Sequence, residues 1–205
     1  MITCMCKIIC ITNRSLCKED FLERIRKIAA AKPDAILLRE KDLSEEDYTA
    51  LAREVAAICR QNEVDCILHT YPEAAISLGI HTLHVPLPVL RTLPDAVHRQ
   101  IALIGASCHS MEEAEEAASL DALYVIAGHI YDTDCKRGLP GRGTDFLRKI
   151  CDSRCIPVYA IGGITPGNIR EVIEAGAAGV CIMSSLMTCD DPAMYLQELR
   201  GALRN

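Results

Sequence analysis

The chain has 205 residues, half of them apolar and 24% charged, and its 28 acidic and 22 basic residues give a formal net charge of −6. This composition excludes an intrinsically disordered chain. The mild acidity argues against a broad nucleic-acid or anionic-membrane footprint, and no apolar run reaches the roughly 18 residues of a membrane span. We therefore expect neither partner. Because no linker or shift in composition interrupts residues 1–205, we expect a single domain.

Cysteine is unusually frequent, with 12 residues. Most of them stand inside apolar runs, as Cys10, Cys66, Cys108 and Cys181 do, where a free thiol behaves as a small apolar side chain. No C-x-x-C pair occurs, so a zinc ribbon is not expected. So many thiols indicate a reducing, cytoplasmic location. The apolar stretch at residues 1–12 lacks a basic leader, which favours a first strand over a signal peptide.

Short β-branched runs alternate with amphipathic helical patterns along the chain. The predicted strands are residues 7–12, 35–39, 66–69, 81–85, 101–107, 122–126, 158–161 and 179–183. The predicted helices are residues 17–31, 44–62, 72–78, 110–120, 143–153, 165–175 and 191–204, with a weakly helical, proline-broken stretch after residue 85. Ser44 and Ser110 are expected N-caps, and Thr165-Pro166 combines a cap with proline at the first helical position.

Eight strand–helix units of about 26 residues each account for the whole length. Continuously apolar strands indicate a parallel sheet that is buried on both faces. We therefore predict an α/β fold, a single (β/α)₈ barrel, with a six-stranded open sheet as the alternative. In such a barrel the functional site lies where the strands end, so the residues that follow each strand are the candidates.

Two neighbouring loops predict a phosphate site. Gly162 and Gly163 follow the seventh predicted strand and precede a helix, so that the backbone and a helix N-terminus could face an anion. Ser184 and Ser185 follow the eighth strand and add hydroxyl and N–H donors. Loops after strands seven and eight are the usual phosphate cradle of these barrels. The alternative is a tight turn into a helix.

Arg39 and Lys41 flank Glu40 at the end of the second predicted strand. In an extended chain, residues two apart share one side, so both cations can face the barrel mouth while Glu40 points away. The functional interpretation is recognition of a phosphorylated or carboxylated substrate. The alternative is a pair of solvated charges on the rim.

The longest loop, residues 128–143, contains four glycines that could serve as hinges of a lid. His129 begins it, where an imidazole can take up and return a proton near neutral pH, although a lone histidine is often structural. His69 and His84 could line the mouth, and His109 could be a packed polar group. A metal site at His69 and His84 is not expected, because few carboxylates follow the strands.

Several motifs, in order along nearly the whole chain, resemble the thiamine phosphate synthase superfamily. They are Arg39-Glu40-Lys41, residues 105–110, residues 128–136, residues 160–164 and residues 175–180. The stretch from Gly128-His129 through Lys136 to Gly143 is most similar to the branch of TenI-type thiazole tautomerases. The resemblance implies a barrel enzyme of thiamine biosynthesis.

Departures from the synthase pattern distinguish the two branches. The resemblance implies an Asn-Asp pair and an acidic segment that hold magnesium in synthases, but this chain has His69-Thr70 and Leu87-Pro88-Val89 there. Leu37 replaces a synthase glutamine, and His129 stands where synthases have proline. We therefore expect no magnesium and no other cofactor. His69 and Tyr71 also depart from the tautomerases, which have a small polar residue and an arginine there.

The tautomerase resemblance implies that a proton moves on a carboxylated thiazole phosphate, which turns an exocyclic-unsaturated tautomer into the aromatic ring. His129 would be the catalytic acid and base, and Ser107, Lys136 and Cys135 would line the pocket. Gly162, Gly163, Ser184 and Ser185 would bind the phosphate, and Arg39 and Lys41 the other anionic end. The alternatives are a thiamine phosphate synthase and a non-catalytic phosphate-ligand-binding protein. A homo-oligomer is possible in each case.

Overall fold

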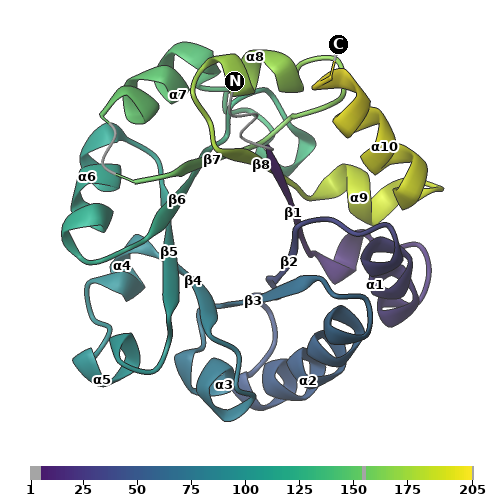
Figure 1. Cartoon of the computed structure of the whole chain (residues 1–205), viewed down its shortest axis with the longest axis vertical. Coiled ribbons are helices and arrows are strands. Elements are labelled where there is room, and N and C mark those ends of the chain that lie inside the picture. The colour runs from purple at the N-terminus through teal and green to yellow at the C-terminus, as the bar shows by residue number, and fades with distance from the viewer. Residues whose placement is uncertain (1–5, 154–155, 205) are drawn as a thin grey trace.

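The computed structural model describes residues 6–153 and 156–204. Eight parallel strands close into one barrel in the order of the sequence (Figure 1). They are β1 (Lys7–Ile11), β2 (Ala35–Leu38), β3 (Asp65–His69), β4 (Thr82–Pro86), β5 (Leu103–Cys108), β6 (Tyr124–Gly128), β7 (Val158–Ile161) and β8 (Gly179–Ile182). The predicted (β/α)₈ barrel is confirmed, and the open six-stranded sheet is wrong. Residues 1–5 of the stretch that was predicted to lead into the first strand lie outside the described residues.

Helices surround this ring of strands (Figure 1). They are α1 (Phe21–Ala30), α2 (Glu45–Gln61), α3 (Pro72–Ser77), α4 (Leu87–Leu90), α5 (Asp95–His98), α6 (Met111–Ser119), α7 (Gly143–Asp152), α8 (Ile169–Glu174), α9 (Ser184–Thr188) and α10 (Pro192–Ala202), with short 3₁₀ turns η1 (Arg14–Leu16) and η2 (Asp134–Lys136). In the described part of the chain, none of the helices has the length and apolar character needed to span a bilayer.

Most predicted helices begin at the predicted cap. Ser44 and Ser110 accept backbone hydrogen bonds at the start of α2 and α6, as the sequence indicates. The prediction that α1 begins at Cys17 is wrong, because the side chain of Asp20 caps the helix and accepts from Glu23 N. The strand ends lie up to two residues from the predicted ends. β6, for example, ends at Gly128 and not at the predicted residue 126, so His129 directly follows the strand.

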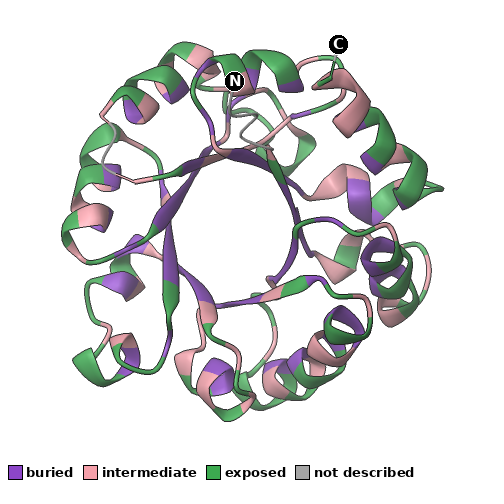
Figure 2. Cartoon of the chain, in the orientation of Figure 1, coloured by how far each residue is buried: buried purple, intermediate pink, exposed green. Residues whose placement is uncertain are grey.

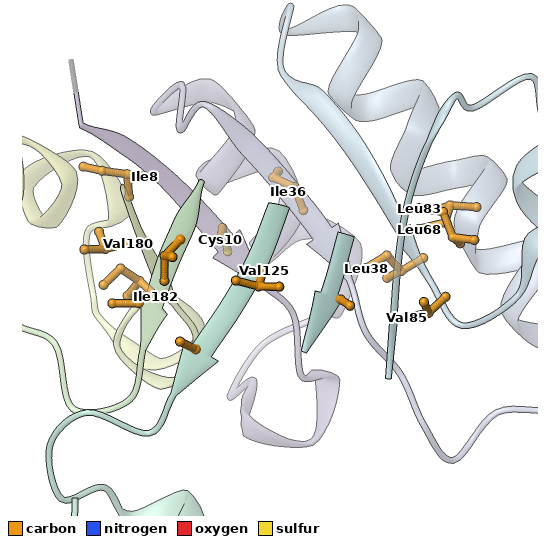
Figure 3. Packing of buried hydrophobic residues seen from close by; sticks show 14 of the residues in the cluster. Ile8, Cys10, Ile36, Leu38, Leu68, Leu83, Val85, Val125, Val180 and Ile182 are labelled. Carbon is orange, nitrogen blue, oxygen red and sulfur yellow. The ribbon is translucent and has the colours of Figure 1, made fainter. Parts of the chain in front are cut away.

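Strand side chains alternate between two apolar layers. In β1, Ile9 and Ile11 point into the barrel interior, where they join a small buried cluster. Ile8 and Cys10 point outward and join the large cluster between strands and helices, part of which Figure 3 shows. Figure 2 shows the resulting pattern, in which the strands and the inner faces of the surrounding helices are buried. This alternation decides which residue after each strand faces the barrel mouth.

Candidate functional site

One cavity of about 810 Å³ lies at the carboxyl ends of the strands. Every residue that the sequence predicts for the site borders it: Arg39, Lys41, His69, His84, Ser107, His129, Cys135, Lys136, Gly162, Gly163, Ser184 and Ser185. These residues come from all strands except β1. The structure therefore brings the predicted set together, and the chemical role of each member stays a prediction.

Side chains alternate between the two faces of β2, and this alternation determines which of the residues at its end face the cavity. Leu37 lies in the interior cluster, and Arg39, two residues on, borders the cavity. Glu40 points away from the cavity, as expected, and is buried behind it. Its carboxylate accepts from Thr12 Oγ1 at 2.7 Å and from the backbone N–H of Arg14 at 3.1 Å. Burial raises the pKa of Glu40, and these hydrogen bonds oppose that shift.

The cations around the cavity fall into two kinds. Arg14 and Arg137, on the rim, pair with Asp42 and Asp134 respectively. Arg39, Lys41 and Lys136 face the cavity without an ion-pair partner among the described residues. The charge of Arg39, more than burial or Lys136, lowers the pKa of Lys41. Like charges held together without a counterion indicate that an anionic ligand belongs between them.

The predicted phosphate loops meet at one side of the cavity, beside the long loop. Gly162 and Gly163 have φ values of +106° and +65°, which only glycine adopts without strain. A Cβ atom on Gly162 would lie 2.3 Å from the Cβ of His129. The two glycines therefore let the β7 loop pack directly against the loop that begins at His129, and both glycines border the cavity.

The prediction that a helix begins at Thr165, and turns its N-terminus toward these glycines, is wrong. α8 begins at Ile169. The side chain of Asn168 intervenes, because its Oδ1 accepts from Thr165 N at 2.8 Å and its Nδ2 donates to the Gly163 carbonyl at 2.9 Å. This local hydrogen-bond pair competes with the helix. The helical dipole invoked for the phosphate is therefore absent at this position.

A short helix that the sequence analysis did not predict follows β8 instead. α9 begins at Ser184, and no side chain caps its first turn. Ser184 and Ser185 border the cavity, and the backbone N–H groups of this first turn have no partner within the helix. Five residues are too few to show a helical period in the sequence, so no signal in the pattern could have located this helix.

Hydrogen bonds join the two ends of the long loop. Arg142 N donates to the His129 carbonyl at 3.0 Å, and Gly141 N donates to Asp132 Oδ1 at 2.7 Å. The Nε2 of His129 lies 3.2 Å from the carbonyl oxygen of Leu139. Because a carbonyl oxygen only accepts, Nε2 carries the proton in the neutral ring, which leaves the lone pair on Nδ1. His129 is thus oriented by the loop and holds one nitrogen ready to accept a proton.

Two of the polar residues that the structure adds to the cavity wall directly follow the strand ends, and the sequence analysis did not assign them to the site. His109 borders the cavity, and its Nδ1 donates to the Gly128 carbonyl at 2.9 Å, next to His129. Asn13 borders it from the β1 side. Both follow a strand, which is the signal that identified the other residues. The sequence leaves open whether His109 lines the mouth or is a packed polar group, because a lone histidine can serve in either role.

Two histidines form the buried wall opposite the glycine loops. His84 lies between Tyr124 and Ser107, with Nδ1 3.2 Å from the tyrosine Oη and Nε2 2.9 Å from the serine Oγ. His69 stacks on it with ring centroids 6.0 Å apart. Burial, followed by the charges of Arg39 and Lys41, lowers the pKa of His69 to about 3. Burial also lowers the pKa of His84. Both imidazoles are neutral at physiological pH.

Magnesium, which the resemblance implies for the synthase branch, does not fit this wall. The expected acidic positions hold Thr70 and Val89, the latter within α4. Among the residues that border the cavity, Asp134 supplies the carboxylate, and its side chain is 90% exposed and paired with Arg137. Within the described residues, no three histidines, cysteines or carboxylates are grouped to hold a metal ion. Mg²⁺ prefers carboxylate oxygens to the imidazoles and hydroxyls present here.

The closed barrel and its cation-lined cavity are typical of enzymes that act on phosphorylated small molecules. The chain belongs to the thiamine monophosphate synthase family, whose model matches residues 8–186. It is 32% identical to the thiamine-phosphate synthase of Pyrococcus abyssi over 95% of this chain and 93% of that protein. It is also 32% identical to the Fusobacterium nucleatum thiamine-phosphate synthase, covering 91% of each.

A solved structure agrees. The thiamine phosphate pyrophosphorylase from Pyrococcus furiosus superposes with a TM-score of 0.82 at 30% identity, covering 97% of this chain and 95% of that one. The expected superfamily is therefore confirmed, and the chain is related to enzymes of thiamine biosynthesis. These relatives are named as thiamine-phosphate synthases or as a thiamine phosphate pyrophosphorylase. Their names favour the synthase alternative over the tautomerase branch.

Proposed function

We propose that this protein is a metal-independent thiazole tautomerase that acts on a carboxylated thiazole phosphate. The observation that carries the proposal is the set of groups around the cavity. Cations without an ion-pair partner among the described residues, imidazoles and hydroxyls border it, and the loop orients His129 so that its neutral ring has the lone pair on Nδ1. An isomerisation that relocates one proton needs such a group, whereas departure of a pyrophosphate needs a metal-bound counter-charge.

In the proposed reaction, Nδ1 of His129 removes a proton from the ring carbon that bears the carboxylate. The electron pair of that C–H bond enters the ring as the exocyclic double bond moves into it. The imidazolium then returns the proton to the exocyclic carbon, so the product is an aromatic isomer of the substrate. The glycine loops and Ser184-Ser185 would hold the phosphate, while Arg39 and Lys41 would stabilise the negative charge at the other end.

Thiamine phosphate synthase is the second candidate, and the names of the relatives support it. That activity would require this chain to bind a pyrimidine pyrophosphate and magnesium without the two aspartates. The cation cluster of Arg39, Lys41 and Lys136 could bind a pyrophosphate, but it offers no ligand to a divalent cation.

Parallel assays of the purified chain distinguish these candidates. The exocyclic tautomer is supplied alone, and its conversion to the aromatic thiazole is followed by absorbance and by incorporation of solvent deuterium. In a second assay, the pyrimidine pyrophosphate and the thiazole phosphate are supplied with magnesium. We expect turnover in the first assay. Turnover in the second assay alone would replace the proposal with the synthase, and binding without turnover in either would leave a ligand-binding protein.

A further inference from the structure

His69 is a buried polar side chain with one free end toward the cavity. It closes β3 and is 5% exposed, and that remaining surface borders the cavity. Its Nδ1 lies 2.6 Å from the hydroxyl of Thr70. Within the described part of the chain, its Nε2 has no hydrogen-bond partner. A polar nitrogen that faces a cavity without a protein partner can be completed by a ligand.

The contact with Thr70 favours one tautomer of His69. The 2.6 Å separation from Thr70 Oγ1 matches the usual O–H donor distance better than the usual N–H···O distance. With the hydroxyl as the donor to Nδ1, the neutral ring carries its proton on Nε2. In this tautomer His69 presents an N–H donor beside Arg39 and Lys41, whose charges add to burial in lowering the pKa of the ring.

The backbone of Thr70 is held in an unusual conformation to make this contact. Its φ is +72°, a region that a β-branched residue rarely occupies. Its N–H donates to the His84 carbonyl at 3.0 Å, and β3 and β4 pair His69 with His84. Strain that the surrounding structure maintains is concentrated at functional positions. The conformation places the Thr70 hydroxyl on Nδ1 and so orients the ring.

We propose that Nε2–H of His69 donates a hydrogen bond to a carboxylate of the ligand, so that the Thr70–His69 pair selects a carboxylated thiazole phosphate over an uncarboxylated one. β3 lies across the ring of strands from β7 and β8, whose loops carry the glycine and serine cradle (Figure 1). A ligand that reaches both walls needs an acceptor at each end. At the β3 end, Arg39 and Lys41 supply positive charge, and the N–H of His69 supplies a directional hydrogen bond.

The identity of the ligand rests on the proposed function, but the test measures binding and not turnover. Affinities for the carboxylated thiazole phosphate, the uncarboxylated thiazole phosphate and inorganic phosphate are measured by calorimetry on the wild type, His69→Leu and His69→Gln. We expect the wild type to prefer the carboxylated ligand. His69→Leu should reduce that preference roughly 10- to 100-fold, as expected for a lost hydrogen bond to a charged group. His69→Gln, whose amide N–H can reach the same position, should restore most of it, and inorganic phosphate should bind all three alike.

Thr70→Val and Thr70→Ser provide a second pair in case His69→Leu does not fold. The first removes the hydroxyl and should lower the preference, and the second keeps the hydroxyl and should not. Nitrogen NMR of the wild type should show His69 protonated on Nε2. A wild type without preference, a preference unchanged in folded His69→Leu or Thr70→Val, or a ring protonated on Nδ1 would each overturn the inference. Absence of tautomer turnover with the preference intact would refute the proposed reaction and support this recognition role.

Discussion

The two walls of the cavity differ in whether backbone or side-chain atoms form them. The wall at β7 and β8 consists mainly of backbone, because Gly162 and Gly163 bring main-chain atoms to the surface and α9 begins at Ser184. The wall at β3 to β5 consists of side chains, with His69, His84 and Ser107 held by hydrogen bonds. The glycine positions of the backbone wall depend on conformation and leave no room for a Cβ atom, whereas the side-chain wall depends on protonation and tautomer. Substitutions and pH should therefore affect the two walls differently.

The largest expected effect lies between the walls, at His129. His129→Ala and His129→Asn should lower tautomer turnover by about two orders of magnitude or more, which is the usual contribution of a positioned acid or base. Inorganic phosphate should bind both variants as it binds the wild type, because the glycine loops and the cations are unchanged. Steady-state kinetics measure the first quantity and calorimetry the second.

His81→Ala is the matched control for His129, because His81 is exposed and precedes β4 at the opposite end of the barrel. It should leave turnover unchanged. Near-normal turnover in both His129 variants would remove that residue as the proton-transfer group. His109, which borders the same cavity and donates to the Gly128 carbonyl, would then be tested next.

The backbone wall is tested by Gly163→Ala, with Gly79→Ala as the matched control. The two glycines have φ values of +65° and +66°, so each alanine incurs the same left-handed strain of about 1–2 kcal/mol. Only at Gly163 would the new Cβ lie 2.6 Å from the Asp132 carbonyl, since nothing lies within 4 Å at Gly79. We expect Gly163→Ala alone to weaken binding of inorganic phosphate, by about tenfold, and to lower stability further.

Calorimetry with inorganic phosphate and urea unfolding of the two variants measure these effects. Gly163→Asp should weaken phosphate binding more than Gly163→Ala, because it adds a like charge to the same displacement. Equal phosphate affinity in Gly163→Ala, Gly79→Ala and the wild type would place the phosphate elsewhere in the cavity.

The same contrast explains what the sequence could predict. Alternating strand and helix patterns predict the barrel, and residues placed after strands are brought to one mouth by that topology alone, as Arg39 and His129 were. Local hydrogen bonds that override a pattern were not predictable. Asn168 delays α8, and Thr70 adopts a left-handed backbone to reach His69, although neither residue breaks any rule of periodicity. The chemical state of the buried wall likewise depends on burial and neighbours that only the fold supplies.

Acid should affect the side-chain wall before it affects the rest of the molecule. The pKa of His69 is lowered to about 3 and that of His84 is also lowered, so the unfolded chain binds protons that the folded chain does not. The stability that they contribute is complete above the unfolded pKa of about 6.5 and is lost as the pH falls toward the folded values. Between pH 6.5 and 5, each histidine should therefore reduce the free energy of unfolding by at most about 1.4 kcal/mol per pH unit.

Urea unfolding at several pH values measures this slope. His69→Leu should show a shallower dependence than the wild type, whereas His81→Ala, at an exposed position, should keep the slope of the wild type. An identical slope in His69→Leu and the wild type would show that His69 is not held neutral by its surroundings.

The smallest expected effect is that of removing divalent metal. Thr70 and Val89 stand where the resemblance implies magnesium-binding aspartates, and the side-chain wall offers imidazoles and hydroxyls that are already hydrogen-bonded to one another. A hard cation gains little from such donors. Tautomer turnover should therefore be unchanged, within error, after exhaustive treatment with a chelator and after addition of magnesium. If chelation abolishes turnover and magnesium restores it, the ligands must come from the loop around Asp134 or from the substrate itself. The contrast between a backbone wall for phosphate and a metal-free side-chain wall for the other end of the ligand would then be wrong.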